Sequence, residues 1–174
     1  MKNIFYLKGF TLVELLVSIA IIGILTAAVV ASSPAAKQGF AIMRSSQGLA
    51  QDIRRAQIKA TAMKEIEGSS PKGYGICLDT NASSSYILFA DQDGNHTYND
   101  KEDILIETIN LETDVKISAL SSGSSLNIVF EPPNPTVWVN NSSSSSSTIT
   151  LHLENNITKT REIFVNSSGL ITTQ

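Results

Sequence analysis

Residues 10–31, FTLVELLVSIAIIGILTAAVVA, decide the architecture of this chain. The stretch is apolar throughout except for one charged side chain, Glu14. As an α-helix with a rise of about 1.5 Å per residue it is about 33 Å long, which is enough to cross the hydrocarbon core of a bilayer. We therefore expect residues 10–33 to form a transmembrane helix.

The nine residues before this stretch form a short basic leader with Lys2 and Lys8. Because basic residues stay on the cytoplasmic side, the leader predicts a single-pass protein with its N-terminus inside and its C-terminus outside the inner membrane. A secretory signal peptide cleaved near Ser32 is the alternative. Signal peptides have apolar regions of about 7 to 15 residues, so this apolar stretch is too long for one.

The overall composition excludes several classes of function. The chain has 174 residues, 13 Lys plus Arg against 16 Asp plus Glu, one cysteine and two histidines, with a net charge of −3. This length suits one modest domain with an appended segment. A single cysteine, Cys77, forms no internal disulfide, and the Cys and His residues do not make a zinc-binding pattern. We find no catalytic motif, so we expect a protein that is not an enzyme and has no cofactor, with calcium as the one exception considered below.

A second helical pattern follows over residues 34–67. Its apolar residues recur at spacings of three, four or seven, which predicts an amphipathic continuation of the first helix. The apolar stripe consists of Ile42, Leu49, Ile53, Ala56, Ala60 and Met63, and the opposite face of Arg44, Gln51, Asp52, Arg55, Lys59 and Lys64. Pro34 and Gly39 are expected to interrupt the helix, and the sequence from Gly68 to Pro71 ends it.

Residues 72–174 change to short runs rich in Ile, Val, Tyr, Phe and Thr between polar turns, which predicts a β-rich globular domain. We expect strands near residues 74–78, 85–90, 104–111, 115–119, 126–130, 136–139, 148–153 and 162–166. The predicted fold class is α+β, a long N-terminal, partly transmembrane helix packed on a C-terminal antiparallel sheet.

A polar loop between two of these strands has the spacing of a calcium site. Oxygen-bearing side chains occupy positions 1, 3, 5, 7, 9 and 12 of the loop, and these are Asp91, Asp93, Asn95, Thr97, Asn99 and Glu102. A calcium loop requires glycine at position 6, where this chain has His96, and Gly94 instead follows Asp93 as in a tight β-hairpin turn. Both readings, a calcium site and a solvated hairpin turn, stay open.

Glu14 is the most unusual residue of the apolar stretch. An isolated carboxylate in a membrane costs about 2.5 to 3.5 kcal/mol, so it needs a partner. Cleavage after Gly9 would create an α-ammonium group on Phe10, and the ammonium group of a neighbouring subunit would neutralise Glu14 on assembly.

The segment Lys8-Gly9-Phe10-Thr11-Leu12-Val13-Glu14 resembles the signal of type IV pilins and type II secretion pseudopilins. In that family a prepilin peptidase cuts after the glycine and N-methylates the phenylalanine. The resemblance implies a pilin fold, processing at Gly9 and Phe10, and an assembly role for Glu14. It implies a filament subunit that lies in membrane lipid before assembly and in an extracellular or periplasmic filament afterwards. The implied partners are other pilin subunits, the peptidase, an inner-membrane platform and an assembly ATPase.

Parts of the globular region, including residues 74–77 and 86–95, resemble the H-type minor pseudopilins and similar minor pilins. Two alternatives remain for the function: a DNA-binding minor pilin for DNA uptake, and a calcium-stabilised adhesive pilin. Beyond Lys2, Lys8 and Glu14 the acidic residues outnumber the basic ones, which disfavours DNA as a partner. A local basic patch at Arg44, Arg54, Arg55 and Lys59 keeps that alternative open.

Overall fold

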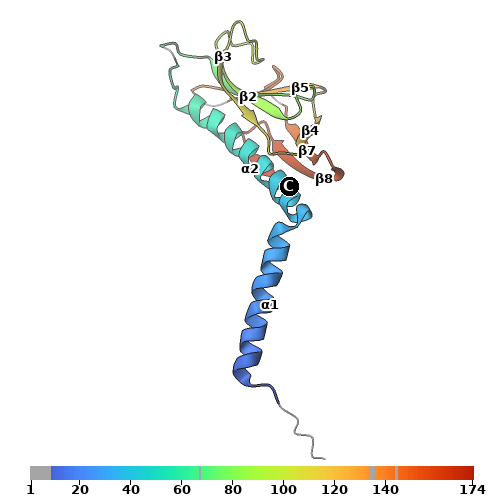
Figure 1. The fold of residues 1–174 in the computed structure, drawn as a ribbon. Coiled ribbons are helices and arrows are strands. Elements are labelled where there is room, and N and C mark those ends of the chain that lie inside the picture. The colour runs from blue at the N-terminus through green and yellow to red at the C-terminus, as the bar shows by residue number, and fades with distance from the viewer. Residues whose placement is uncertain (1–8, 67, 134–135, 144) are drawn as a thin grey trace, which may run out of the picture. The chain divides into compact units, whose positions relative to one another are not determined.

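The first element of the chain is a long apolar helix, α1 (Leu12–Ser32). The computed structural model describes residues 9–66, 68–133, 136–143 and 145–174, and in it α1 begins after Thr11 and ends before Ser33 (Figure 1). Ser33 has extended backbone angles, φ −63° and ψ 126°. Because proline disfavours helical angles in the residue before it, Pro34 explains why α1 ends here.

Pro34 is also the first residue of the second helix, α2 (Pro34–Thr61), a position that suits its fixed φ and missing N–H. The expected interruption at Pro34 is confirmed. The interruption expected at Gly39 is wrong, since α2 continues through that residue. A Cβ atom there would lie 3.0 Å from the Lys159 Nζ, so glycine at this position leaves room for the lysine side chain.

The expected apolar stripe of α2 forms its buried face. Ile42, Leu49, Ile53, Ala56 and Ala60 are all buried. Met63 is 56% exposed, so its assignment to the stripe was wrong. The helix ends at Thr61 and Met63 has a positive φ of 44°, which takes its side chain out of the helical periodicity.

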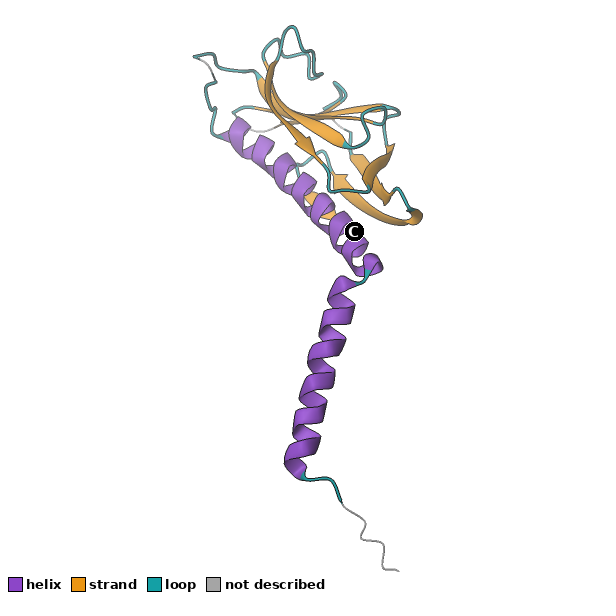
Figure 2. Cartoon of the chain, viewed as in Figure 1, coloured by secondary structure: helices purple, strands orange, loops and turns teal. Residues whose placement is uncertain are grey.

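Two antiparallel sheets follow α2 (Figure 2). The first has the order β3-β2-β1-β5-β6 and the second the order β4-β7-β8-β9. The strands are β1 (Gly73–Asp79), β2 (Ser85–Asp91), β3 (Ile104–Asn110), β4 (Val115–Leu120), β5 (Ser125–Glu131), β6 (Thr136–Val139), β7 (Ser147–Leu153), β8 (Asn156–Val165) and β9 (Ile171–Thr173). All eight expected strands are present, so the α+β class is confirmed. β8 begins earlier than expected, and β9 was missed.

The core lies between α2 and the inner faces of both sheets. Strand alternation points Tyr74, Ile76 and Leu78 of β1 into this core, where they are fully buried with Leu49 and Ile53 of α2. Ile149 and Leu151 of β7 join the same cluster from the second sheet. By contacts, the chain divides into two units, residues up to Lys37 and Gln38–Gln174. The whole of this core therefore belongs to the second unit.

Candidate functional site

The expected cleavage site lies next to the start of α1. Gly9 and Phe10 are exposed and non-helical, and Phe10 is 76% exposed. No other part of the described chain comes within 4 Å of a Cβ placed on Gly9. The remainder of the leader, residues 1–8, lies outside the described residues. The peptide bond between Gly9 and Phe10 is thus flanked by exposed backbone that no helix hydrogen bond constrains.

Glu14 lies in the first turn of α1, three residues after the N-cap Thr11. The Glu14 backbone N–H donates to the Thr11 Oγ1 at 3.2 Å. A threonine followed three residues later by glutamate has the spacing of a capping box, and a carboxylate also interacts favourably with the positive end of the helix dipole. Glu14 therefore has a local role within its own helix, which sequence reasoning missed although the Thr-x-x-Glu spacing was the available signal.

The rest of α1 presents apolar side chains in every direction. The helical segment Leu12–Val30 is long and apolar enough to cross a membrane, and none of this segment is buried within the chain. Its two inner hydroxyl groups are satisfied locally, since Ser18 Oγ donates to the Glu14 carbonyl at 2.7 Å and Thr26 Oγ1 to the Ile22 carbonyl at 2.8 Å. The helix thus exposes almost no unpaired polar group, and its apolar surface fits a membrane anchor.

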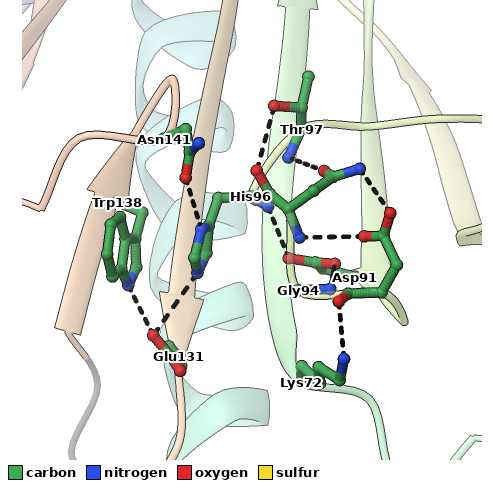
Figure 3. Close-up of polar contacts among 10 residues, drawn as sticks. Lys72, Asp91, Gly94, His96, Thr97, Glu131, Trp138 and Asn141 are labelled. Atoms are coloured by element: carbon green, nitrogen blue, oxygen red, sulfur yellow. Dashed lines mark hydrogen bonds and ion pairs between the residues drawn. The ribbon is translucent and has the colours of Figure 1, made fainter.

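The polar loop after β2 is organised around the buried carboxylate of Asp91. Its Oδ1 accepts the Gly94 N–H at 2.6 Å, and its Oδ2 accepts the His96 N–H at 3.0 Å (Figure 3). Gly94 and His96 both have positive φ, 79° and 61°. His96, at the loop position where a calcium site requires glycine, thus adopts the left-handed conformation for which glycine is normally chosen.

Three carboxylates meet in this loop. Ligand oxygens of Asp91, Asp93 and Asp103 all lie within 4.8 Å of one another. Asp103 was not predicted, because it follows the twelfth loop position. It is held in place by the Gln92 N–H on Oδ1 at 3.0 Å and the Asn99 N–H on Oδ2 at 2.8 Å.

The other predicted ligands form local hydrogen bonds, and among them Asn95 donates its side-chain N–H to the Asp93 Oδ2 at 2.6 Å. Glu102 is exposed and accepts the Asn99 side-chain N–H at 2.8 Å. The Asn95 side-chain oxygen accepts the Thr97 N–H at 2.7 Å, and the Thr97 hydroxyl contacts the Asn95 carbonyl. Of the three carboxylates that were predicted as ligands, the structure therefore brings together Asp91 and Asp93, leaves Glu102 outside, and adds Asp103.

The pKa values of the two central carboxyl groups move in opposite directions. Burial is the main cause that raises the pKa of Asp91, and the N–H groups of Gly94 and His96 oppose it. The pKa of Asp93 is lowered, mainly by the Asn95 backbone N–H. A buried carboxyl with a raised pKa is stabilised by a proton or a cation, and the oxygen-only donor set matches what Ca²⁺ prefers.

His96 fastens the loop to the outer side of the first sheet. Its ring stacks on Trp138 of β6 with centroids 4.0 Å apart and an interplanar angle of 9°. Nδ1 lies 3.0 Å from the Asn141 side-chain oxygen, and Nε2 lies 3.5 Å from Glu131, which also accepts the Trp138 indole N–H at 2.7 Å (Figure 3). Sequence reasoning missed this cluster, because its members are far apart along the chain.

The basic patch on α2 is largely occupied by internal contacts. Arg44 lies 3.6 Å from Glu112, and Arg55 pairs with Glu107 at 2.6 Å. Arg54 donates to the Ile171 carbonyl at 3.0 Å. Three of the four residues of the predicted patch thus already have partners, and fewer charges remain for DNA phosphates.

Comparison with known proteins identifies one part of the chain. Residues 7–30 match the family model described as the prokaryotic N-terminal methylation motif. Neither a curated protein nor a solved structure matches the chain. The matched residues include Gly9, Phe10, Glu14 and the apolar part of α1 up to Val30. The chain therefore carries a type IV pilin-like N-terminal methylation signal ahead of an α+β domain.

Proposed function

We propose that this chain is a structural subunit, a minor pilin or pseudopilin, of a type IV pilus or a type II secretion pseudopilus. The match of residues 7–30 to the N-terminal methylation motif carries the proposal. The fully exposed apolar surface of α1 supports it, because that surface needs lipid before assembly and neighbouring helices afterwards. The resemblance of residues 74–77 and 86–95 favours an H-type minor subunit.

The first step we propose is processing at the cytoplasmic face of the inner membrane. Lys2 and Lys8 hold the leader inside, and the domain after α1 is exported. A prepilin peptidase then hydrolyses the bond between Gly9 and Phe10, and the new α-amino group of Phe10 takes a methyl group from a sulfonium methyl donor, with release of the thioether and a proton. The exposed, non-helical backbone at this bond favours access by the peptidase.

The second step is assembly on an inner-membrane platform driven by an ATPase. The α1 helices of neighbouring subunits pack together, and the Glu14 carboxylate pairs with the Phe10 ammonium group of a neighbour. N-methylation keeps that amine basic, so the pair remains ionic. The interaction removes an unpaired carboxylate from apolar surroundings and sets the register between subunits.

Processing is tested by expressing the full chain with and without a prepilin peptidase and analysing the N-terminal peptide by mass spectrometry. We expect loss of residues 1–9 and a product that begins with N-methyl-Phe10. Gly9→Val is the control, since a bulky side chain before the cut should leave the leader in place. An intact leader on the unmodified chain, or a product that begins at Ser32, rejects the prepilin proposal.

A secondary proposal is that calcium binds the loop of residues 91–103 and stabilises the domain. The proximity of Asp91, Asp93 and Asp103 favours it, because three carboxylates within 4.8 Å repel one another without a cation. The remaining ligands would come from the side-chain oxygens of Asn95 and Asn99 after their turns rearrange, and from backbone carbonyls and water. The thermal-unfolding test is given in the Discussion.

A further inference from the structure

The C-terminal half of α2 presents a groove on the face opposite the core. The groove has a volume of about 350 Å³ and is lined by Gln51, Arg55, Ile58, Lys59, Ala62 and Lys64. Ile58 is 67% exposed in the middle of it. A single exposed isoleucine is ordinary on a protein surface, so binding at this groove depends on the charges around it. We call these six residues the α2 groove.

Two cations of the α2 groove, Lys59 and Lys64, have no salt-bridge partner among the described residues, although the charge of Glu107 acts on Lys59. Arg55 shares its charge with Asp52 and Glu107, at 3.4 Å and 2.6 Å. The pKa of Lys59 is lowered, first by burial and then by the charges of Lys64 and Arg55. The groove is thus locally positive, although the chain as a whole carries a net charge of −3.

The complementary surface of the domain is the loop of residues 91–103. It contains five acidic residues and one lysine, and Asp93, Asp100 and Glu102 are exposed. The loop covers the outer side of the first sheet, where the ring of Tyr98 contacts that of Phe89 with centroids 5.2 Å apart. The neighbours of Phe89 along β2, Leu88 and Ala90, face the core that contains α2. The positive groove and the negative loop therefore lie on opposite faces of the first sheet.

We propose that the α2 groove binds the acidic loop, residues 91–103, of a second copy of this chain. A symmetric contact between two α2 grooves is disfavoured, because it places Lys59 and Lys64 against the same cations of the partner. A contact between opposite faces is heterologous, so it joins two copies without closing a symmetric dimer. This inference rests on the proposed function, which supplies the assembly in which the two surfaces meet.

The test uses the full chain, co-expressed with a prepilin peptidase and the assembly machinery, with a photoreactive benzoylphenylalanine at Gln51. Mixing isotopically light and heavy chains identifies cross-links between copies by mass spectrometry. We expect cross-links from position 51 of one copy to residues 91–103 of another. The same photoreactive residue at Thr160, an exposed position on β8, is the control and should give no cross-link to that loop.

Exchanging charges between the two surfaces tests whether their opposite charges contribute to the contact. Lys59→Glu and Asp100→Lys should each lower the cross-link yield about threefold, as expected for a rim charge pair. The double variant should return to within about twofold of the original yield. Arg161→Glu, which reverses an exposed charge on β8, is the matched control and should leave the yield unchanged.

The outcomes separate this inference from the proposed function. Cleaved, assembled chains whose position-51 cross-links map to another α2 groove, to lipid or to a different protein overturn the inference and leave the proposed function intact. A double variant that stays as low as the single variants also overturns it. If the leader remains uncleaved and no assembly forms, both proposals fail.

Discussion

Replacing Glu14 by glutamine separates two roles that the structure assigns or allows for this residue. Within its own helix, Glu14 is the third residue after the N-cap Thr11 and donates its backbone N–H to the Thr11 hydroxyl oxygen. Glutamine serves the same capping position nearly as well as glutamate. In a filament, however, glutamine cannot neutralise the ammonium group of a neighbouring Phe10. Glu14→Gln therefore keeps the capping position, loses only the small attraction of the carboxylate to the helix dipole, and removes the proposed intersubunit pair.

The two roles differ greatly in magnitude. Removing one partner of a buried ion pair costs about 3–5 kcal/mol, because the other charge stays uncompensated. At about 1.4 kcal/mol per tenfold change, this lowers the association constant between subunits at least a hundredfold. Losing only the interaction of Glu14 with the helix dipole costs about 0.3–1 kcal/mol, which is a change of about two- to fivefold. An incorporation assay distinguishes these ranges easily.

The assay compares the amount of subunit in sheared filaments with the amount left in the membrane, for cells that express equal levels of each variant. We expect Glu14→Gln to be nearly absent from filaments while it is still cleaved after Gly9. Thr11→Ala is the matched control, since it removes the N-cap oxygen and keeps the charge, and it should change incorporation by about fivefold or less. Incorporation of Glu14→Gln at the level of Thr11→Ala would refute the charge-pairing argument.

Four further predictions concern the domain after α1. A chain that begins at Ala35 should be a soluble, folded monomer with mixed helix and strand circular dichroism, because the whole core lies within residues 38–174; aggregation of this truncated chain would contradict it. On the same truncated chain, calcium at ten times its dissociation constant should add about 1.4 kcal/mol and raise Tm by about 4 °C, and Asp93→Ala should abolish the shift. No shift at millimolar calcium would leave the loop a solvated turn. Because burial raises the pKa of Asp91, its ionisation opposes folding, so without calcium its contribution to stability should decline as pH rises above about 3.8. Asp91→Asn should remove that decline when the free energy of unfolding is measured by urea titration at a series of pH values. An unchanged dependence of that free energy on pH would contradict the assignment to Asp91. Finally, burial raises the pKa of Cys77 to about 11. Its thiol should therefore react with iodoacetamide at pH 7 far more slowly than a free cysteine does. Equal rates would contradict this and show that β1 opens around Cys77.

Much of the fold was predictable because it depends on periodicity. The spacing of Ile42, Leu49 and Ile53 predicted the buried face of α2, and runs rich in β-branched and aromatic residues between polar turns located eight strands. The missed features depend on local geometry. β9 has only three residues, too few for a pattern, and the first seven residues of β8 are all exposed, so no buried apolar side chain marks them in the sequence. Met63 fits the apolar spacing but follows the end of the helix.

The candidate sites likewise divide into one that could be predicted from the sequence and one that depends on local geometry. The signal at Gly9, Phe10 and Glu14 is contiguous, so its residues are recognisable without a fold. The loop site depends on which oxygens converge, and backbone N–H groups decide this. Asp91 is drawn inwards by the Gly94 and His96 N–H groups, while the Asn95 and Asn99 side-chain oxygens are taken up by the N–H groups of Thr97 and Lys101. A calcium loop needs those oxygens turned towards a common centre, so ion binding would require these turns to rearrange. Calcium should therefore lower the protection of the Thr97 and Lys101 amides in hydrogen exchange while it raises Tm. A rise in Tm with unchanged amide protection would instead limit the protein's ligands to Asp91, Asp93, Asp103 and backbone carbonyls.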